Sequence, residues 1–143
     1  MGEFVADATI KELIKVGKAP KNSKIVILGL TFKENCPDTR NSKVEDIIKR
    51  LAEYEIEPVV VDPWASEEDA MKEYGVTLTK LDDIKDVDCI ILAVAHNEFK
   101  EISLDKLKSL YKESKDSEKV LMDVKGLYDI KDLKNSNIKF WRM

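Results

Sequence analysis

Short apolar runs alternate along this chain with segments whose apolar residues recur at helical spacing. Five runs predict strands: KIVILGL (24–30), EPVVVDP (57–63), CIILAVA (89–95), KVLMDVKG (119–126) and IKFWRM (138–143). The third is the most apolar and the best candidate for a central strand, whereas the last, with its charged residues, is expected at a sheet edge.

The opening segment predicts a helix, because four of its apolar residues fall roughly on one face: Val5, Ile10, Leu13 and Ile14. Gly17 and Pro20 break that pattern, so we expect a linker helix over residues 1–17. The first four residues, Met-Gly-Glu-Phe, are typical of a cloning remnant, which would fit a domain excised from a longer chain.

Three further helices are marked by their ends. Ser42 and Glu45 have the spacing of a capping box before an apolar face. Ser66 and Asp69 have capping spacing, with Gly75 as the stop for that helix. A lysine-rich helix is expected over residues 103–111, and residues 76–88 predict a short strand and one helical turn.

Strands that alternate with helices predict an α/β fold, a Rossmann-like three-layer sandwich with a mostly parallel sheet and helices on both faces. In such folds ligands lie beyond the carboxyl ends of the strands. The loops to examine are therefore residues 30–42, 62–66, 95–99 and 123–128.

Composition excludes several classes of protein. The 24 basic and 28 acidic side chains nearly cancel, which argues against nucleic acid as the main partner. No apolar run reaches the roughly 18 residues of a membrane span, and the start does not resemble a signal peptide, so we expect no membrane contact and a cytoplasmic location. The two cysteines have no metal-ligand spacing and are expected to be reduced.

The loop after the first strand contains Gly29 alone, so it lacks the glycines with which a dinucleotide fingerprint approaches a pyrophosphate. It offers charge instead. Lys33 suits a phosphate or a polar sugar oxygen, and the planar fork of Arg40 suits a phosphate. The alternative, weighed about evenly, is that Arg40 forms a surface ion pair with Asp38 and that Lys33 is solvated.

Four other polar residues lie on the candidate loops. Asp62 ends a strand where a Rossmann domain places its ribose-binding acid, but without the glycines we interpret Asp62-Pro63 as the start of a turn. A catalytic role for Cys36 is disfavoured, because no histidine is near it in sequence. His96 could line a binding site or could hydrogen-bond a loop, and we favour the second, structural role. Lys125 ends a strand on the ligand side.

The motifs GLTFKENCPDTRNSKV, VVVDPWA, ILAVAHNEF and MDVKG, in this order, resemble the C-terminal UDP-binding domain of the UDP-glucose/GDP-mannose dehydrogenase family over residues 18–143. The first motif is most similar to the UDP-N-acetylglucosamine and UDP-N-acetylgalactosamine 6-dehydrogenases of the Vi-polysaccharide type. The resemblance implies a nucleotide-sugar dehydrogenase that oxidises the C6 alcohol to a carboxylate for polysaccharide synthesis, with two NAD+ and a cysteine nucleophile.

The resemblance also implies roles for individual residues. Phe32 and Lys33 match the pair that contacts the UDP-sugar, and Arg40 matches an arginine that reaches NAD. Lys125 falls where glucose-specific relatives carry an arginine that binds substrate. The catalytic cysteine motif has no match around Cys36 or Cys89, so we expect no catalytic residue here.

The partner domains implied are an NAD-binding N-terminal domain, which holds most of the cofactor, and a central helical domain through which the parent forms a homodimer. A fragment of this kind would be inactive alone. The alternatives are a self-standing nucleotide-sugar binding or regulatory module and a generic α/β domain with surface charges. An upstream reading frame of about 250 to 300 residues, the size of two ordinary domains, would separate the first reading from the second.

Overall fold

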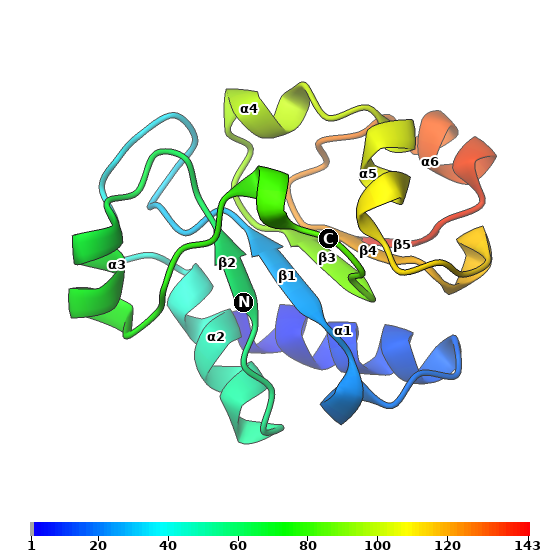
Figure 1. The fold of residues 1–143 in the computed structure, drawn as a ribbon, viewed down its shortest axis with the longest axis horizontal. Helices are drawn as coiled ribbons and strands as arrows, with labels where there is room; N and C mark the ends of the chain where they lie inside the picture. Colours follow the sequence, from blue (N-terminus) through cyan, green and yellow to red (C-terminus); the bar gives the residue numbers. More distant parts are fainter. Residues whose placement is uncertain (1) are drawn as a thin grey trace.

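The computed structural model describes residues 2–143 and shows one five-stranded sheet in the order β2-β1-β3-β4-β5, with every neighbouring pair parallel (Figure 1). The strands are β1 (Ile25–Leu28), β2 (Val59–Val61), β3 (Cys89–Leu92), β4 (Val120–Asp123) and β5 (Lys139–Arg142). The predicted α/β class and the central position of the third strand are confirmed. β5 lies at an edge, as expected.

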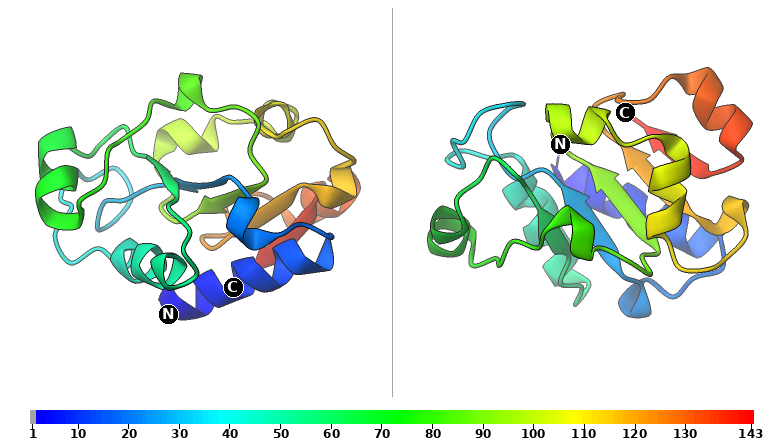
Figure 2. Two further views of the ribbon diagram at one scale, coloured as in Figure 1. Left: turned by 60° about the horizontal axis from the view of Figure 1, so that its bottom comes forward. Right: turned by 45° about the horizontal axis from the view of Figure 1, so that its top comes forward.

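Helices cover both faces of the sheet (Figure 2). The helices are α1 (Gly2–Lys15), α2 (Val44–Glu53), α3 (Glu67–Tyr74), α4 (Asn97–Lys100), α5 (Leu104–Leu110) and α6 (Ile130–Ser136). Three 3₁₀ turns complete the regular structure: Pro20–Asn22, Leu81–Asp83 and Asp116–Glu118. Helices α1 and α2 pack on one face, α4, α5 and α6 lie over the other, and α3 lies beyond β2 (Figure 1).

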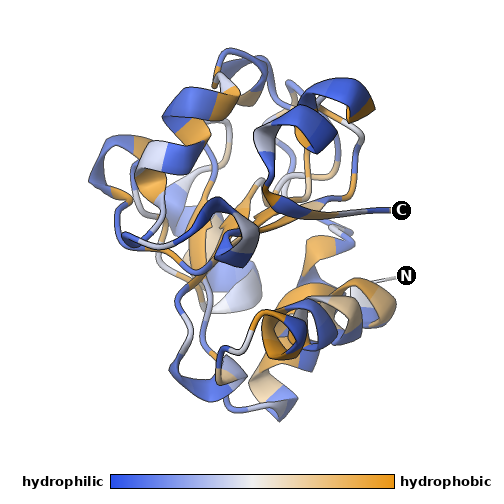
Figure 3. Ribbon diagram, turned by 90° about the vertical axis from the view of Figure 1, so that its right-hand side faces the viewer, coloured by the Kyte–Doolittle hydropathy of each residue, from blue (hydrophilic) through white to orange (hydrophobic). Residues whose placement is uncertain are grey.

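The two hydrophobic cores follow from the alternation of side chains along each strand. In β1, Ile25 and Ile27 point into the core beneath α1 and α2, whereas Val26 and Leu28 point into the core beneath α5. Strands β1, β2 and β3 are apolar throughout because both of their faces are covered, whereas the edge strand β5 carries Lys139 and Arg142. The helices mix polar and apolar residues (Figure 3).

Most of the predicted helix ends are confirmed. The Ser66 hydroxyl accepts from the Asp69 N–H at the start of α3, and Gly75 ends that helix with φ 67°. Ser103 caps α5 in the same way through the Lys106 N–H. These signals are local in sequence and need no distant partner, which is why the pattern predicts them well.

The capping box predicted for Ser42 and Glu45 is wrong. The Ser42 hydroxyl accepts from the Val44 N–H, only two residues on, and its own N–H donates to the Tyr74 hydroxyl. The Glu45 carboxylate instead pairs with Lys49 at 2.6 Å. Helix α2 therefore begins at Val44, with no side-chain cap at the residue before it.

Ile14 was also assigned wrongly to the buried face of the first helix, because 59% of its surface is exposed. It lies about 100° around the helix from Leu13, which is fully buried. Helices α4 and α6 were not predicted; both are short, with four and seven residues. The expected turn and short strand in residues 76–88 are present as the Leu81–Asp83 turn and the Val60–Leu78 bridge.

Helix α1 is built into the core of this unit. Val5, Ala6 and Leu13 are almost completely buried in the cluster that covers one face of the sheet. Gly2 lies so close to α2 that an added Cβ would overlap the side chain of Asp46. The opening helix therefore contributes to the packing of the sheet.

Candidate functional site

The loops that follow β1, β2 and β3 meet at the carboxyl edge of the sheet. From β1 the chain crosses to β2 on one side and then to β3 on the other, so the strand order reverses beside β1. Open α/β sheets bind ligands at this position, because the diverging loops leave a crevice there. Three of the four candidate loops lie at this point, and the fourth follows β4.

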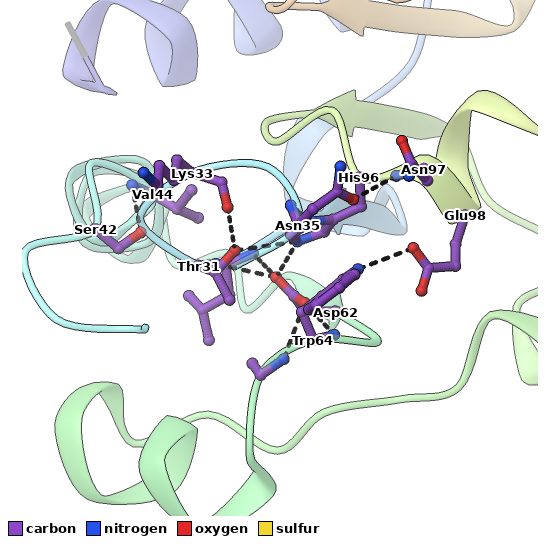
Figure 4. Close-up of polar contacts among 12 residues, drawn as sticks. Thr31, Lys33, Asn35, Ser42, Val44, Asp62, Trp64, His96, Asn97 and Glu98 are labelled. Carbon is purple, nitrogen blue, oxygen red and sulfur yellow. Dashed lines mark hydrogen bonds and ion pairs between the residues drawn. The ribbon is translucent and has the colours of Figure 1, made fainter. Parts of the chain in front are cut away.

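Asp62, at the end of β2, is the hub of these loops (Figure 4). Its Oδ2 accepts from the N–H groups of Leu30 at 2.6 Å and Thr31 at 3.0 Å. Its Oδ1 accepts from the N–H groups of Trp64 at 2.8 Å and Ala65 at 3.1 Å. The second pair is the turn predicted for Asp62-Pro63, which is confirmed, and the first pair links two strands.

The environment of Asp62 stabilises its ionised form. Burial on its own would raise the pKa of this carboxyl. The hydrogen bonds from His96, Leu30 and Thr31 outweigh that effect and hold the pKa of Asp62 below its ordinary value. Asp62 is thus an anion whose oxygens are occupied by N–H donors of the protein, so it does not offer a ribose its carboxylate.

His96 is fully buried and contacts all three loops (Figure 4). Its Nδ1 lies 2.9 Å from the Asn35 backbone nitrogen. Its Nε2 lies 3.0 Å from Asp62 Oδ2 and 3.1 Å from Thr31 Oγ1. The Thr31 hydroxyl also lies 3.0 Å from the carbonyl oxygen of Lys33. The structural role favoured for His96 is confirmed.

Two side chains extend this network. The Asn35 side-chain oxygen accepts from the Asn97 N–H at 2.9 Å, at the start of α4. The Trp64 ring stacks on His96 with centroids 6.1 Å apart, and its Nε1 donates to Glu98 at 2.9 Å. The sequence reasoning missed Thr31 and Asn35; the turn-forming Asn in the loop was the one available signal.

Phe32 and Lys33 are presented outward from this network. Phe32 is 54% exposed although it is aromatic, and Lys33 is exposed. The Phe32 N–H donates to the Asp38 carbonyl at 2.7 Å, which closes the base of the loop. An exposed aromatic ring beside an exposed lysine, on a loop held from beneath, is suited to a ligand with an apolar face and negative charge.

Arg40 forms the ion pair with Asp38 that sequence reasoning gave as one alternative. Its Nε and Nη2 lie 3.1 and 3.2 Å from the two carboxylate oxygens. These hydrogen bonds, with the one from the Arg40 backbone, lower the pKa of Asp38. The Arg40 side chain remains 76% exposed, so the guanidinium is accessible to a group outside this unit.

Lys125 lies in the turn after β4 and is exposed. It lines a hollow of about 370 Å³ between α1, α2 and the ends of β3 and β4. Other residues of this hollow are Val5, Lys43, Val44, Ile47, Ala93 and Val124. Lys43 was missed, because a lysine before a helix has no distinctive pattern. Phe32, Lys33 and Arg40 do not line this hollow.

The turn at Lys125 has an aspartate of its own. Asp123 is fully buried, and its oxygens accept from the Leu127 N–H at 2.8 Å and the Tyr128 N–H at 3.1 Å. Gly126 takes φ 65° within this turn. The turn is thus closed by bonds between residues close in sequence.

Other parts of the described chain offer less chemistry. A hollow of about 580 Å³ lies outside β2, between the ends of α2 and α3 and away from the candidate loops. Cys89 is fully buried in β3, where burial raises the pKa of its thiol, and Cys36 is partly buried in the first loop. Within residues 2–143 no group of three potential metal ligands was found, and no helix is long and apolar enough to cross a membrane.

The chain is similar to known proteins along most of its length. It is 46% identical over 129 residues to a UDP-N-acetyl-D-glucosamine 6-dehydrogenase of Pseudomonas aeruginosa, a match that covers 90% of this chain and 30% of that protein. It is 37% identical over 131 residues to the Salmonella typhi protein of the same name, covering 92% of this chain and 28% of that protein. The chain thus spans under a third of these relatives.

The fold has the same likeness. An NDP-N-acetyl-D-galactosaminuronic acid dehydrogenase from Methanosarcina mazei superposes with a TM-score of 0.85 at 18% identity, over 99% of this chain and 29% of that one. The model of the UDP binding domain of the UDP-glucose/GDP-mannose dehydrogenase family matches residues 26–130. That match includes the loops after β1, β2, β3 and β4, and this chain belongs to the UDP-glucose/GDP-mannose dehydrogenase family, as its UDP-binding domain.

Proposed function

We propose that this chain is the UDP-sugar-binding C-terminal part of an NAD-dependent dehydrogenase that oxidises the C6 alcohol of a UDP-N-acetylhexosamine or UDP-hexose to a carboxylate. The family match over residues 26–130 carries the proposal. The relatives at 46% and 37% identity are both named for UDP-N-acetyl-D-glucosamine, which favours an N-acetylhexosamine. Residues 18–143 carry the binding loops, and residues 1–17 are a linker helix that packs on their sheet and leads to the rest of the parent.

The binding surface we propose is the loop after β1 together with the turn after β4. Phe32 and Lys33 contact the UDP-sugar, and Lys125 adds a second positive charge. The exposure of all three side chains at the carboxyl edge of the sheet supports this assignment. Lys33 stabilises negative charge beside the sugar, because an ammonium placed where charge develops lowers the barrier of the reaction.

The residues described here do not fit a complete NAD site. The first loop contains Gly29 alone, and the carboxylate of Asp62, in the position of a ribose-binding acid, is occupied by protein N–H groups. We propose that the cofactor is held mainly by an N-terminal domain and that Arg40 reaches it from this side. Arg40 would then exchange Asp38 for the cofactor when the parts close together.

The partners of this unit are the NAD-binding and central helical domains of a homodimeric, cytoplasmic parent. We expect neither Cys36 nor Cys89 to act as the nucleophile of the oxidation. The purified 143-residue chain should therefore form no NADH from NAD+ and a UDP-sugar. Production of NADH by the chain alone would contradict this assignment.

Titration of UDP into the isotopically labelled chain tests the binding surface directly. We expect saturable amide shifts at residues 31–42 and 123–127, abolished by Lys33→Ala. Lys85→Ala is the matched control, because Lys85 is also exposed but precedes β3, at the amino ends of the strands. Shifts that persist in Lys33→Ala, or that vanish equally in Lys85→Ala, would refute the assignment.

Kinetics of the full-length parent separate the roles of the charged residues. Loss of the Lys33 contact should lower kcat by about a hundredfold or more. Lys125→Ala should act mainly on KM for the sugar nucleotide, and Arg40→Ala on KM for NAD+. If Lys33→Ala and Arg40→Ala leave turnover and both Michaelis constants unchanged, the first loop is not part of the site.

A further inference from the structure

We propose that His96, in its neutral form with the proton on Nε2, is a positioning residue that holds residues 31–35 in the conformation presenting Phe32 and Lys33. Protonation of the ring breaks its bond with Asn35 and loosens that end of the loop, so that ligand capture there depends on the charge of His96. The consequence for UDP rests on the proposed function, whereas the coupling between ring and loop does not.

The hydrogen bonds of the ring determine its tautomer. The Asn35 backbone N–H can only donate, so the His96 Nδ1 that it meets at 2.9 Å must be an unprotonated acceptor. The proton of the neutral ring is therefore on Nε2, which donates towards Asp62 Oδ2 at 3.0 Å and Thr31 Oγ1 at 3.1 Å. The Thr31 hydroxyl then donates to the Lys33 carbonyl.

A second proton on the ring is incompatible with this arrangement. It would place an Nδ1–H against the Asn35 N–H, and two donors facing each other repel. The Asp62 carboxylate would favour the cation, but it lies on the opposite side of the ring, at Nε2. Protonation therefore keeps the contacts of Nε2 with Asp62 and Thr31 and breaks the contact of Nδ1 with Asn35.

The groups around the ring leave few other charges to consider. Asp62 faces it from the end of β2, and Trp64 and Phe99 are neutral rings at centroid distances of 6.1 and 5.5 Å. The Glu98 carboxylate accepts a hydrogen bond from Trp64 Nε1 and is linked to His96 through the Trp64 ring. From the first loop, the groups that contact the ring are the Thr31 hydroxyl and the Asn35 N–H.

The loop needs these bonds to keep its shape. Asn35 takes φ 54°, a left-handed conformation that asparagine adopts more readily than most residues but that still costs more than for glycine. Phe32, with just over half its surface exposed, adds little burial to hold the loop. The loop is held mainly by polar bonds, through Thr31, Asn35 and the Phe32–Asp38 backbone pair. Removal of the bond at Nδ1 frees Asn35, two residues after Lys33.

A pH titration of the chain, followed by nuclear magnetic resonance with labelled imidazole nitrogens, tests the coupling without any ligand. At neutral pH we expect the signature of the Nε2–H tautomer. As the ring takes up its second proton, the amides of Lys33 and Asn35 should shift with the same midpoint, while those of Leu121 in β4 stay in place. An Nδ1–H tautomer, or loop amides whose shifts do not follow the protonation of the ring, would overturn the proposal.

His96→Asn supplies the matched variant. An asparagine oxygen can replace Nδ1 as the acceptor for the Asn35 N–H, but it does not titrate. The loop amides of this variant should keep their neutral-pH positions and lose the pH response. A pH response identical to that of the natural chain would assign the effect to another group and overturn the proposal. If the variant does not fold, the titration of the natural chain still decides.

UDP binding distinguishes this inference from the proposed function. The terminal phosphate of UDP also takes up a proton near pH 6, so affinities are compared between the natural chain and His96→Asn at each pH. Protonation of His96 should weaken binding about three- to tenfold in the natural chain relative to the variant, the effect of one hydrogen bond.

A ratio that does not change with pH would overturn the regulation by His96. Failure of UDP to bind either chain, with the loop amides still following the ring, would instead count against the proposed UDP site and support the coupling. Lys33→Ala should remove UDP binding and leave the coupling between His96 and Asn35 intact. Loss of the coupling in that variant would contradict the hydrogen-bond chain described here.

Discussion

Two strands of the sheet end in a buried aspartate, but the two carboxylates accept hydrogen bonds from very different parts of the chain. Asp62, at the end of β2, binds the backbone of Leu30 and Thr31 after β1 and the ring of His96 after β3, at separations of 31 to 34 residues. Asp123, at the end of β4, binds N–H groups four and five residues on. One carboxylate joins three loops, and the other closes one turn.

The comparison separates the two halves of the proposed binding surface. The loop with Phe32 and Lys33 depends on contacts from two neighbouring strands, so substitutions near the ends of those strands should change its conformation. The turn with Lys125 depends on its own strand. Perturbations of the first region should therefore spread over three loops, and perturbations of the second should stay local.

The largest effect is expected from Asp62→Ala. It leaves the N–H groups of Leu30 and Thr31 without an acceptor in a buried setting, and each such loss costs about 1 to 3 kcal/mol. We expect a loss of at least about 3 kcal/mol in the free energy of unfolding. Denaturant titration measures it, and amide shifts should extend over residues 30–35 and 94–99. Shifts confined to residues 62–66 would contradict the role of Asp62 as a hub.

The next effect contrasts two glycines with positive φ. An added Cβ at Gly29, with φ 108°, would lie 2.5 Å from the Cβ of Val94, so Gly29→Ala should cost about 3 kcal/mol from strain and overlap together. At Gly126 the Cβ would meet only the end of the Arg142 side chain, which can move. Gly126→Ala should cost about 1 to 2 kcal/mol. Thermal unfolding of both variants tests the order, and equal losses would contradict it.

Asp123→Ala should have a smaller and local effect. Two N–H groups lose their acceptor, but Leu127 and Tyr128 are only partly buried, so water can replace part of the bonding. We expect a loss of about 1 to 2 kcal/mol in the free energy of unfolding, with amide shifts limited to residues 123–129. Changes in the amides of Lys33 or Asn35 would show that the two regions are not independent.

The smallest effect is a pH dependence. The pKa of Asp62 in the folded protein lies below its ordinary value of 3.8, because hydrogen bonds from His96, Leu30 and Thr31 outweigh its burial. Its stabilisation is therefore present above about pH 4 and is lost as pH falls through the lowered pKa. The free energy of unfolding of Asp62→Asn should fall less steeply with acid than that of the natural chain. Parallel curves would contradict this.

The sequence predicted the parts of this fold that depend on neighbouring residues. Strand runs, the Ser66 cap and the glycine stop of α3 each involve residues within a few positions of one another. The same reasoning identified the loops at the carboxyl edge, because parallel strands place their ends together. It correctly predicted the turn at Asp62-Pro63, which is also a local feature.

The network at the site could not be predicted in this way. The bond between Asp62 and His96 spans 34 residues, and nothing in either segment indicates which donors the carboxylate will meet. Ser42 and Glu45 show the opposite error, since a local pattern predicted a cap while a distant hydroxyl, that of Tyr74, took the Ser42 N–H. A tertiary contact can thus replace a local hydrogen bond that the sequence pattern allows.

The contrast between the two cysteines gives this protein a pair of internal reporters. Cys36 lies in the first loop and is partly accessible, whereas Cys89 is sealed within the central strand, where burial disfavours its thiolate. Because alkylating reagents attack the thiolate, Cys36 should be labelled during local motions of the loop and Cys89 only when the sheet opens. The ratio of the two labelling rates would then distinguish loosening of the first loop from unfolding of the domain, with no engineered probe.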